Sequence, residues 1–449
     1  MTMIALGGIV GAGLFVGSGT VVHAAGPAAI VAYMIGGLLV VIVMRMLAEM
    51  ATAQPARGSF AEYARVAIGD GAGFVVGWTY WYFWVVVIAF EAVAGAKIIH
   101  SWVPAAPLWV TALLIMGVMT AVNLLSVRAF GEMEFWFASI KIIAILAFLI
   151  VGALWAAGAL PSAHGHVPAP LHEPFAPSGA SGFLHALIVV VFSYFGAEIV
   201  TIAAAESAEP TKAIARATVS IVWRVIVFYV GTVAVIVAVV PWTQVPTDTS
   251  PFVTVLDRIG IPGAGPAMQV IILTAVLSLL NSGIYTASRM LFALTERGEA
   301  PSFLAKSSRR GAPVRAILLC TTIGWISVIL AVVSPDGVFS LLLNAAGAVA
   351  LVIYAAIAVS QLRMRRRLER TAPEGLQVRM WAFPLLTWAT IAALAGVVIA
   401  MAVLPEDRSQ LLFGLIAPAA AVLAHLIRRA VTRFRNGPRA HGTADDLHA

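Results

Sequence analysis

The sequence has 449 residues, of which 61% are hydrophobic and only 11% carry a charged side chain, and its mean hydropathy is +0.96. Soluble domains carry about 25% charged residues, so these values exclude a soluble globular protein. The apolar runs continue for about 20 residues, which is enough to cross a hydrocarbon core of about 30 Å and too long for the alternating strands of a transmembrane barrel. The single cysteine, Cys320, allows no internal disulfide and is expected to be a small buried residue. The composition therefore predicts an all-α polytopic membrane protein.

The apolar runs predict twelve transmembrane helices. In chain order they cover residues 3–24, 28–53, 73–100, 107–126, 134–157, 184–206, 219–240, 266–293, 314–333, 338–361, 380–403 and 410–429. Lys and Arg concentrate in the loops on one side of the membrane and in the C-terminal tail, whereas the other side holds only Arg258 and Arg408. The positive-inside rule therefore places both termini in the cytoplasm. The same rule explains the net charge of +7 without nucleic acid as a partner.

Two of the predicted spans contain unusual interruptions. The first carries GGIVGAGLFVGSG (residues 7–19), with six glycines, and the sixth carries FSYFGAEIVTIAAAE (residues 192–206). Each glycine inside a helix costs about 1 kcal/mol relative to alanine. Small residues also permit close helix packing, which is the alternative explanation. Because five spans separate the two starts, the second segment runs in the inverted direction. Paired helix breaks in inverted halves mark the substrate site of many secondary transporters, and this interpretation is favoured.

Few ionisable residues fall inside the predicted spans, and three of them need a functional explanation. Glu91 lies about two-thirds of the way across the third span, and Lys141 lies about two turns into the fifth. Lys141 either faces the bundle and satisfies carbonyl groups freed by an unwound helix, or snorkels to the cytoplasmic surface. Glu198 follows the break in the sixth span; it either takes up and releases a proton or is held in a fixed set of hydrogen bonds.

Two other charged residues, Arg45 and Glu49, lie at the cytoplasmic end of the second predicted span and have a structural explanation. They are four residues apart, so an i,i+4 ion pair or a contact with lipid headgroups is expected.

Several long segments carry a family resemblance. They include GGIVGAGLF, RMLAEMA, GEMEFWFASIKIIAILAF, FSYFGAEIVTIAAAES and NSGIYTASRMLFALTERGEAP. These segments resemble the amino acid transporter family of the amino acid–polyamine–organocation superfamily, over essentially the whole chain. Three more, NLLSVRAFGE, EIVTIAAAES and AVSQLRMR, most resemble the bacterial gamma-aminobutyrate (GABA) permeases within that family. The family usually carries a cytoplasmic tail before the first span, so the start at Met1 has the pattern of a truncated or misassigned one.

The resemblance implies a LeuT-type fold of two inverted five-helix repeats, residues 1–157 and 158–361. Residues 362–449 would then form two further helices and the basic cytoplasmic tail. It also implies proton-coupled uptake that does not require sodium.

The resemblance further assigns roles to individual positions. Backbone N–H groups of Gly11, Ala12 and Gly13 would bind the substrate carboxylate. The carbonyl of Ile9 and those near Phe192 and Phe195 would bind its ammonium group, and the two phenylalanines would also gate the site. Ala12 stands where many relatives carry a hydroxyl side chain, which leaves the identity of the substrate open.

Further positions are assigned in the same way. Lys141 matches a lysine that occupies the place of sodium in sodium-coupled relatives, and Glu198 matches an acidic position after the second break. Ser282 and Asn344 would face the substrate. Glu91 is grouped with Lys141 and Glu198 as a residue for proton coupling or structural charge.

We therefore expect a proton-coupled importer of GABA or a related ω-amino acid in the bacterial inner membrane. The alternatives are the same mechanism with an aromatic, small or basic α-amino acid, and an amino acid exchanger that needs no proton-binding group. A nutrient sensor is disfavoured by the short basic C-terminal tail, and an enzyme by the lack of metal or nucleophile motifs within the spans. The expected partners are the substrate, protons and the lipid bilayer, without a cofactor, a metal ion or an obligate protein partner.

Overall fold

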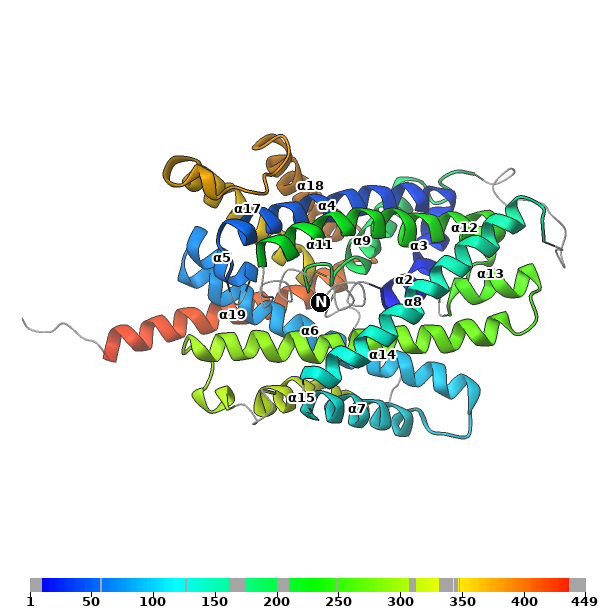
Figure 1. The fold of residues 1–449 in the computed structure, drawn as a ribbon, viewed down its shortest axis with the longest axis horizontal. Helices are drawn as coiled ribbons and strands as arrows, with labels where there is room; N and C mark the ends of the chain where they lie inside the picture. Colours follow the sequence, from blue (N-terminus) through cyan, green and yellow to red (C-terminus); the bar gives the residue numbers. More distant parts are fainter. Residues whose placement is uncertain are drawn as a thin grey trace, which may run out of the picture.

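The computed structural model describes residues 10–56, 59–125, 127–160, 174–199, 210–247, 249–306, 312–330, 342, 346 and 348–435. These residues form a bundle of helices, most of which run along the longest axis of the molecule (Figure 1). Eight helical segments in the described ranges are long and apolar enough to cross a membrane, and two shorter apolar helices accompany them. The prediction of an all-α polytopic membrane protein is confirmed; the count of twelve spans and the inverted repeats remain predictions.

The first helical segment among the described residues is divided at two points. Helix α2 (Ala12–Phe15) is followed by α3 (Gly17–Ala25), and the short 3₁₀ turn η1 (Gly26–Ala28) leads into α4 (Ala29–Ala53). Gly26 adopts a φ of +59°, a conformation that disfavours other residues. The turn at η1 separates the first two predicted spans.

The other helices that carry the bundle follow in chain order. They are α5 (Ser59–Ala67), α6 (Asp70–Trp102), α7 (Leu108–Leu125), α8 (Val127–Ala156), α9 (Gly179–Ser193), α11 (Pro210–Arg224), η3 (Val225–Gly231), α12 (Thr232–Val239), α13 (Pro251–Ile259), α14 (Ala264–Glu296), α15 (Val314–Leu330), α17 (Val349–Thr371), α18 (Leu385–Val403) and α19 (Arg408–Arg435). The short turns η4 (Trp242–Gln244), η5 (Ser302–Ala305) and η6 (Pro373–Gly375) lie in connecting segments.

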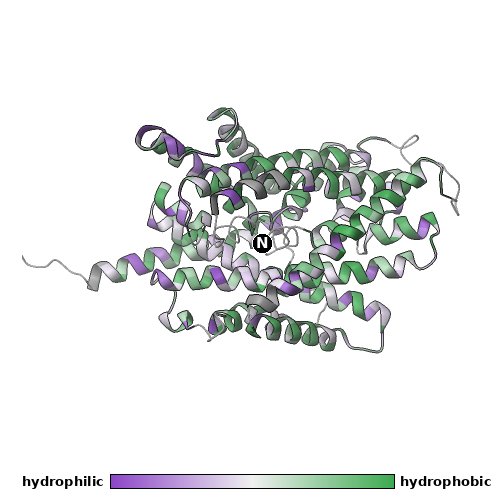
Figure 2. Cartoon of the chain, viewed as in Figure 1, coloured by the Kyte–Doolittle hydropathy of each residue, from purple (hydrophilic) through white to green (hydrophobic). Residues whose placement is uncertain are grey.

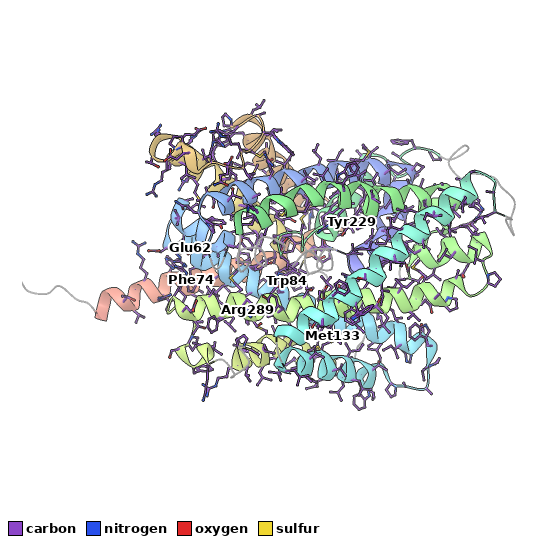
Figure 3. All side chains as sticks on the ribbon, in the orientation of Figure 1. Glu62, Phe74, Trp84, Met133, Tyr229 and Arg289 are labelled. Carbon is purple, nitrogen blue, oxygen red and sulfur yellow. The ribbon has the colours of Figure 1, made fainter. Side chains whose placement is uncertain are left out.

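Helices α6 and α14 form the centre of the molecule. The two helices pack along each other. In the most apolar 18-residue stretch of each helix, 78% of the residues are buried in α6 and 61% in α14, compared with 17% in α19. A helix that is apolar all round belongs in the core, whereas one whose apolar residues are exposed can face lipid. Trp84 on α6 lies in the middle of the bundle, and Glu62 and Phe74 lie toward the end that carries α5 (Figure 3). The residues that reach the two predicted breaks from α6 and α14 therefore come from two long helices packed in the core.

The end of the bundle that carries α5 is polar and rich in ion pairs. Arg65 Nη2 lies 2.6 Å from Glu299 Oε1, and Arg297 Nη2 lies 2.5 Å from Glu62 Oε2. These contacts join α5 to the segment that follows α14. The hydrophilic stretches of α17 and α19 lie at the same end, while apolar residues dominate the middle of the bundle (Figure 2). The distribution of Lys and Arg predicts that this end is cytoplasmic.

The structure corrects the expected pairing of Arg45 with Glu49. Glu49 is buried, and its carboxylate accepts hydrogen bonds from Arg365 Nη1 at 2.6 Å and from Gln361 Nε2 at 2.7 Å, both on α17. Arg45 Nε instead donates to the carbonyl oxygen of Arg379 at 3.0 Å. A buried carboxylate needs several donors to offset its lost hydration, and one arginine in the next helical turn supplies fewer than α17 does.

Candidate substrate and proton site

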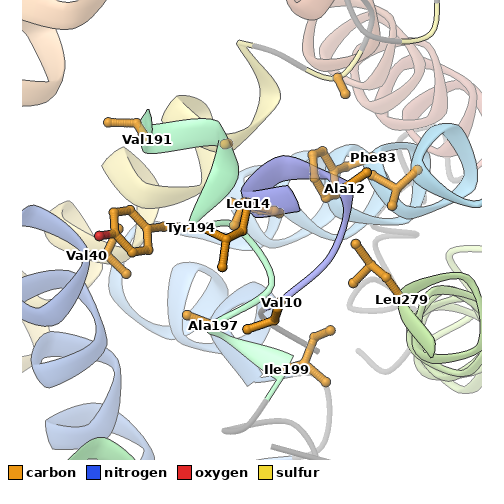
Figure 4. Close-up of a cluster of buried hydrophobic side chains, with 14 of the residues drawn as sticks. Val10, Ala12, Leu14, Val40, Phe83, Val191, Tyr194, Ala197, Ile199 and Leu279 are labelled. Carbon is orange, nitrogen blue, oxygen red and sulfur yellow. The ribbon is translucent and has the colours of Figure 1, made fainter. Parts of the chain in front are cut away.

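The first predicted break falls where the glycine-rich segment enters α2, and the residues before Val10 lie outside the described ones. Val10 and Gly11 are not helical, and α2 begins at Ala12 after an extended Gly11 (φ −140°, ψ −156°). The first N–H groups of a helix have no acceptor within it. A Cβ atom on Gly13 would lie 3.1 Å from the Cα atom of Ser193, so the missing side chain permits close approach to α9. Figure 4 shows Val10 and Ala12 beside Leu279 of α14, with Tyr194 on the far side of α2.

The second break lies where α9 ends. The helix stops at Ser193, and residues 194–198 form turns. Within them Gly196 has a φ of +111°, which side chains other than hydrogen disfavour. The predicted interruption of the sixth span is therefore present, and α9 packs against α3, so the two interrupted segments are neighbours.

A tyrosine that the sequence analysis missed satisfies the backbone at the second break. Tyr229 Oη donates a hydrogen bond of 3.1 Å to the carbonyl oxygen of Ser193. Tyr229 lies on the π-helical turn η3 between α11 and α12, in the upper part of the bundle in Figure 3. Single π turns are frequent at functional sites because they re-aim a side chain within a helix.

Lys141 on α8 points into the bundle. Its Nζ donates to the carbonyl oxygen of Val10 at 3.1 Å and to Ser278 Oγ at 2.8 Å, and only 1% of the residue is exposed. The lysine therefore satisfies a carbonyl group at the first break, as predicted, and does not snorkel to the surface. The contact is with Val10; Ile9, which was predicted as a ligand, lies outside the described residues.

A buried carboxylate on the same helix, Glu134, belongs to this network and was not predicted. Ser278 Oγ donates to Glu134 Oε1 at 2.6 Å, and Asn281 Nδ2 lies 3.5 Å from Oε2. The hydroxyl of Ser278 thus bridges the ammonium of Lys141 and the carboxylate of Glu134. Glu134 is fully buried, so the lysine has a counter-charge two helical turns away on its own helix.

Glu91 on α6 reaches the first break from the opposite side. It is 2% exposed, and its carboxylate lies against the backbone N–H of Ala12 and within electrostatic range of Lys141. Its Oε2 atom is buried and has no hydrogen-bond partner among the described residues. Glu91 therefore lies directly at the opened backbone with one oxygen available for a further contact.

Glu198 is held by its own turn. Its Oε2 accepts the backbone N–H of Gly196 at 3.0 Å, and its Oε1 accepts Tyr80 Oη at 3.2 Å. The residue is fully buried. These contacts are those expected of a carboxylate that stabilises the second break, which was one of the two interpretations of this residue.

Two cavities meet at the breaks. The smaller, of about 30 Å³, is lined by Gly11, Gly13, Glu91, Phe195 and Leu279 among others. The larger, of about 590 Å³, extends toward Ser250 and Asp257 at the end of the bundle opposite α5.

Aromatic side chains lie between and beside these cavities. Phe192 and Phe90 line both of them. Phe195 packs on Phe83, with ring centroids 4.2 Å apart. The positions of Phe192 and Phe195 are suitable for gating passage from the large cavity to the small one.

The structure does not place the other two predicted substrate ligands, Ser282 and Asn344, at either cavity. Ser282 is fully buried on α14 and is not among the residues that line the two cavities. Asn344 lies outside the described residues. Of the predicted site, the structure thus places Gly11, Gly13, Glu91, Phe192 and Phe195 around one small cavity. Lys141 contacts Val10 next to this cavity, and Glu198 supports the second break.

Comparisons with known proteins agree with the pattern of apolar helices. A family profile described as "Amino acid permease" matches residues 1–427. The gamma-aminobutyric acid permease of Bacillus subtilis (strain 168) is 49% identical over 431 residues, which cover 96% of this chain and 92% of the relative. The gamma-aminobutyric acid permease of Escherichia coli (strain K12) is 45% identical and covers 92% and 89%. The aromatic amino acid transport protein AroP of Corynebacterium glutamicum is 41% identical and covers 91% and 89%.

Proposed function

Because the chain belongs to the amino acid permease family, we propose that it imports GABA or a related ω-amino acid together with protons. The observation that carries this proposal is the small cavity between the two interrupted helices, with Lys141 and Glu91 beside it. Two relatives named as GABA permeases, at 45–49% identity, support the choice of substrate. The protein would act in the bacterial inner membrane with both termini in the cytoplasm.

The backbone at the breaks suits a zwitterion. An opened helix offers partial charges of about half a unit, positive at free N–H groups and negative at free carbonyl groups. Gly11 and Gly13 line the small cavity, so their N–H groups would receive the substrate carboxylate.

The ammonium group would bind at the second break. The Val10 carbonyl is engaged by Lys141, and the Phe192 carbonyl accepts the N–H of Phe195 at 3.0 Å. Among the described residues, no N–H group donates to the carbonyl of Phe195. This carbonyl is therefore the best acceptor for the substrate ammonium.

An aromatic side chain shared by the two cavities is suitably placed to gate binding. Phe192 lies between the small cavity and the large one. Rotation of Phe192 would join the two volumes and admit the substrate.

Proton coupling would use groups at the breaks. Lys141 would supply a fixed cation at the Val10 carbonyl, which suits uptake without sodium. Glu91 and Glu198 are the candidates for the transported proton, and the free Oε2 of Glu91 favours it over Glu198.

A second substrate class is supported by one observation. AroP of Corynebacterium glutamicum is 41% identical over almost the same span, so an aromatic α-amino acid is the alternative substrate. An exchanger would retain the same site but would need no proton.

Competition of labelled GABA uptake in proteoliposomes separates these substrates. We expect a tenfold excess of unlabelled GABA, 5-aminopentanoate or 3-aminopropanoate to suppress uptake more strongly than phenylalanine, alanine or lysine. Stronger competition by phenylalanine than by the ω-amino acids would overturn the substrate assignment and leave the transport mechanism standing.

A further inference from the structure

Glu91 places a carboxylate at the position proposed for the substrate carboxylate. The Glu91 carboxylate lies against the N–H of Ala12, between Gly11 and Gly13, which line the small cavity together with Glu91. Two ionised carboxylates at this separation repel each other strongly in a site with little water. The substrate and an ionised Glu91 therefore compete for the same amides.

The other charges near Glu91 do not remove this conflict. The cation that faces Glu91 is Lys141 of α8, which also interacts electrostatically with Glu134. The hydroxyl of Ser278 accepts a hydrogen bond from Lys141 and donates one to Glu134. The charge of Lys141 is therefore shared between two carboxylates before any substrate binds. Glu198 lies at the other break, where Tyr80 and Gly196 hold it.

The geometry of Glu91 provides a way to resolve the conflict. Its Oε2 atom is buried, has no hydrogen-bond partner among the described residues, and belongs to a side chain that lines the cavity. A protonated Glu91 carries no charge and can donate its O–H to an acceptor in that cavity. The acceptor with the matching chemistry is the carboxylate of the bound substrate.

We infer that protonation of Glu91 admits the substrate carboxylate, so that one proton and one amino acid bind as a unit at the first break. This inference rests on the proposed function, because it assigns the coupling step to a residue at the same site. A proton from the large cavity occupies Glu91 as the substrate binds, and both leave to the cytoplasm when the site opens there. Lys141 remains charged and continues to hold the Val10 carbonyl.

Proton uptake on binding to the wild-type protein gives the first test. The purified protein in weakly buffered detergent solution is mixed with GABA or with 4-aminobutanamide, which keeps the ammonium group and lacks the carboxylate. We expect about one proton to be taken up per GABA bound and none per amide bound, at a pH where Glu91 is ionised in the free protein. Binding of GABA without proton uptake at every pH between 5 and 9 would overturn the inference.

The Glu91→Gln variant gives the second test, because glutamine imitates the protonated carboxyl group. For the wild type, the KM for GABA should rise by up to about tenfold per pH unit on the alkaline side. In the variant, the KM should vary less than about twofold over the same range, and GABA exchange should continue while proton-driven accumulation is lost. Glu374→Gln, at an exposed position in the α17–α18 connection, is the control and should behave as the wild type.

The competing role for Glu91 is direct binding of the substrate ammonium. In that case Glu91→Gln would weaken inhibition by 4-aminobutanamide as strongly as it weakens GABA binding, and this result would overturn the inference. A different result would separate this inference from the proposed substrate. No ω-amino acid would be transported, but the KM of another amino acid would show the same pH dependence and would lose it in Glu91→Gln. The coupling of Glu91 protonation to substrate binding would then stand, and only the proposed substrate would fail.

Discussion

At the scale of single residues, the site depends on side chains that satisfy an opened backbone. Lys141 is a buried lysine whose ammonium contacts one carbonyl and one hydroxyl oxygen. A charged group in such a place is costly unless partners surround it, and Glu134 provides the opposite charge through Ser278. Removal of Lys141 leaves Glu134 buried without its cation.

Substitution of Lys141 tests this network. We expect Lys141→Ala to reduce GABA uptake in proteoliposomes by at least about 100-fold, because loss of one partner of a buried pair costs roughly 3–5 kcal/mol. Lys306→Ala, at an exposed lysine beyond α14, is the matched control. The amount of protein in the membrane is measured in parallel by quantitative immunoblotting. Wild-type uptake by Lys141→Ala at an equal amount of protein would show that the contact with Val10 is not required.

The sequence allowed part of this network to be predicted. Lys141 stands out because a lysine in an apolar run two turns from the membrane surface is rare. Glu134 does not stand out, because it falls at the predicted start of its span, where a carboxylate in contact with water is ordinary. Its burial depends on α14, which supplies Ser278 and Asn281 from more than 140 positions away. Pairings across such distances leave no local pattern, and the wrong pairing of Arg45 with Glu49 has the same cause.

At the scale of elements, the breaks depend on close approach between helices. A Cβ atom on Gly11 would collide with the side chain of Leu279 on α14. Gly11 itself has an extended backbone that any residue can adopt. Position 11 therefore requires glycine for a steric reason, which is the close approach of the Leu279 side chain.

A pair of substitutions tests this contact. Gly11→Ala should reduce transport by roughly 10- to 100-fold, the equivalent of 1–3 kcal/mol of overpacking. Gly11→Ala combined with Leu279→Ala should recover a substantial part of the uptake, because the colliding side chain is shortened. Gly117→Ala on α7, where a Cβ atom would make only ordinary contact with Trp325, should remain close to wild type. Failure of the double variant to recover any activity, with normal amounts in the membrane, would contradict the steric explanation.

The elements themselves were well predicted, since continuous apolar runs determine helix positions in a membrane. The break after Ser193 was also predictable, because Gly196 and Glu198 interrupt an apolar helix at mid-depth. The π turn that carries Tyr229 was not, because its segment VIVFYVG reads as an ordinary apolar helix. The turn depends on tertiary contacts, including the bond from Tyr229 to the Ser193 carbonyl.

At the scale of the whole molecule, the two ends of the bundle differ. The large cavity runs from the breaks toward α13 and the segment around Ser250, while ion pairs of Arg65 and Arg297 tie α5 to the segment after α14 at the other end. The charge distribution predicts that the first end is extracellular. The large cavity and these ion pairs thus lie at opposite ends of the bundle.

We propose that a proton gradient drives uptake of an ω-amino acid through this site. The most direct measurement is accumulation of labelled GABA in proteoliposomes with an acidic exterior and no sodium, compared with vesicles at equal pH on both sides. We expect accumulation above the external concentration only when the proton gradient is present, and its collapse when a protonophore is added. A strict requirement for sodium, or equal uptake with and without the proton gradient, would contradict it.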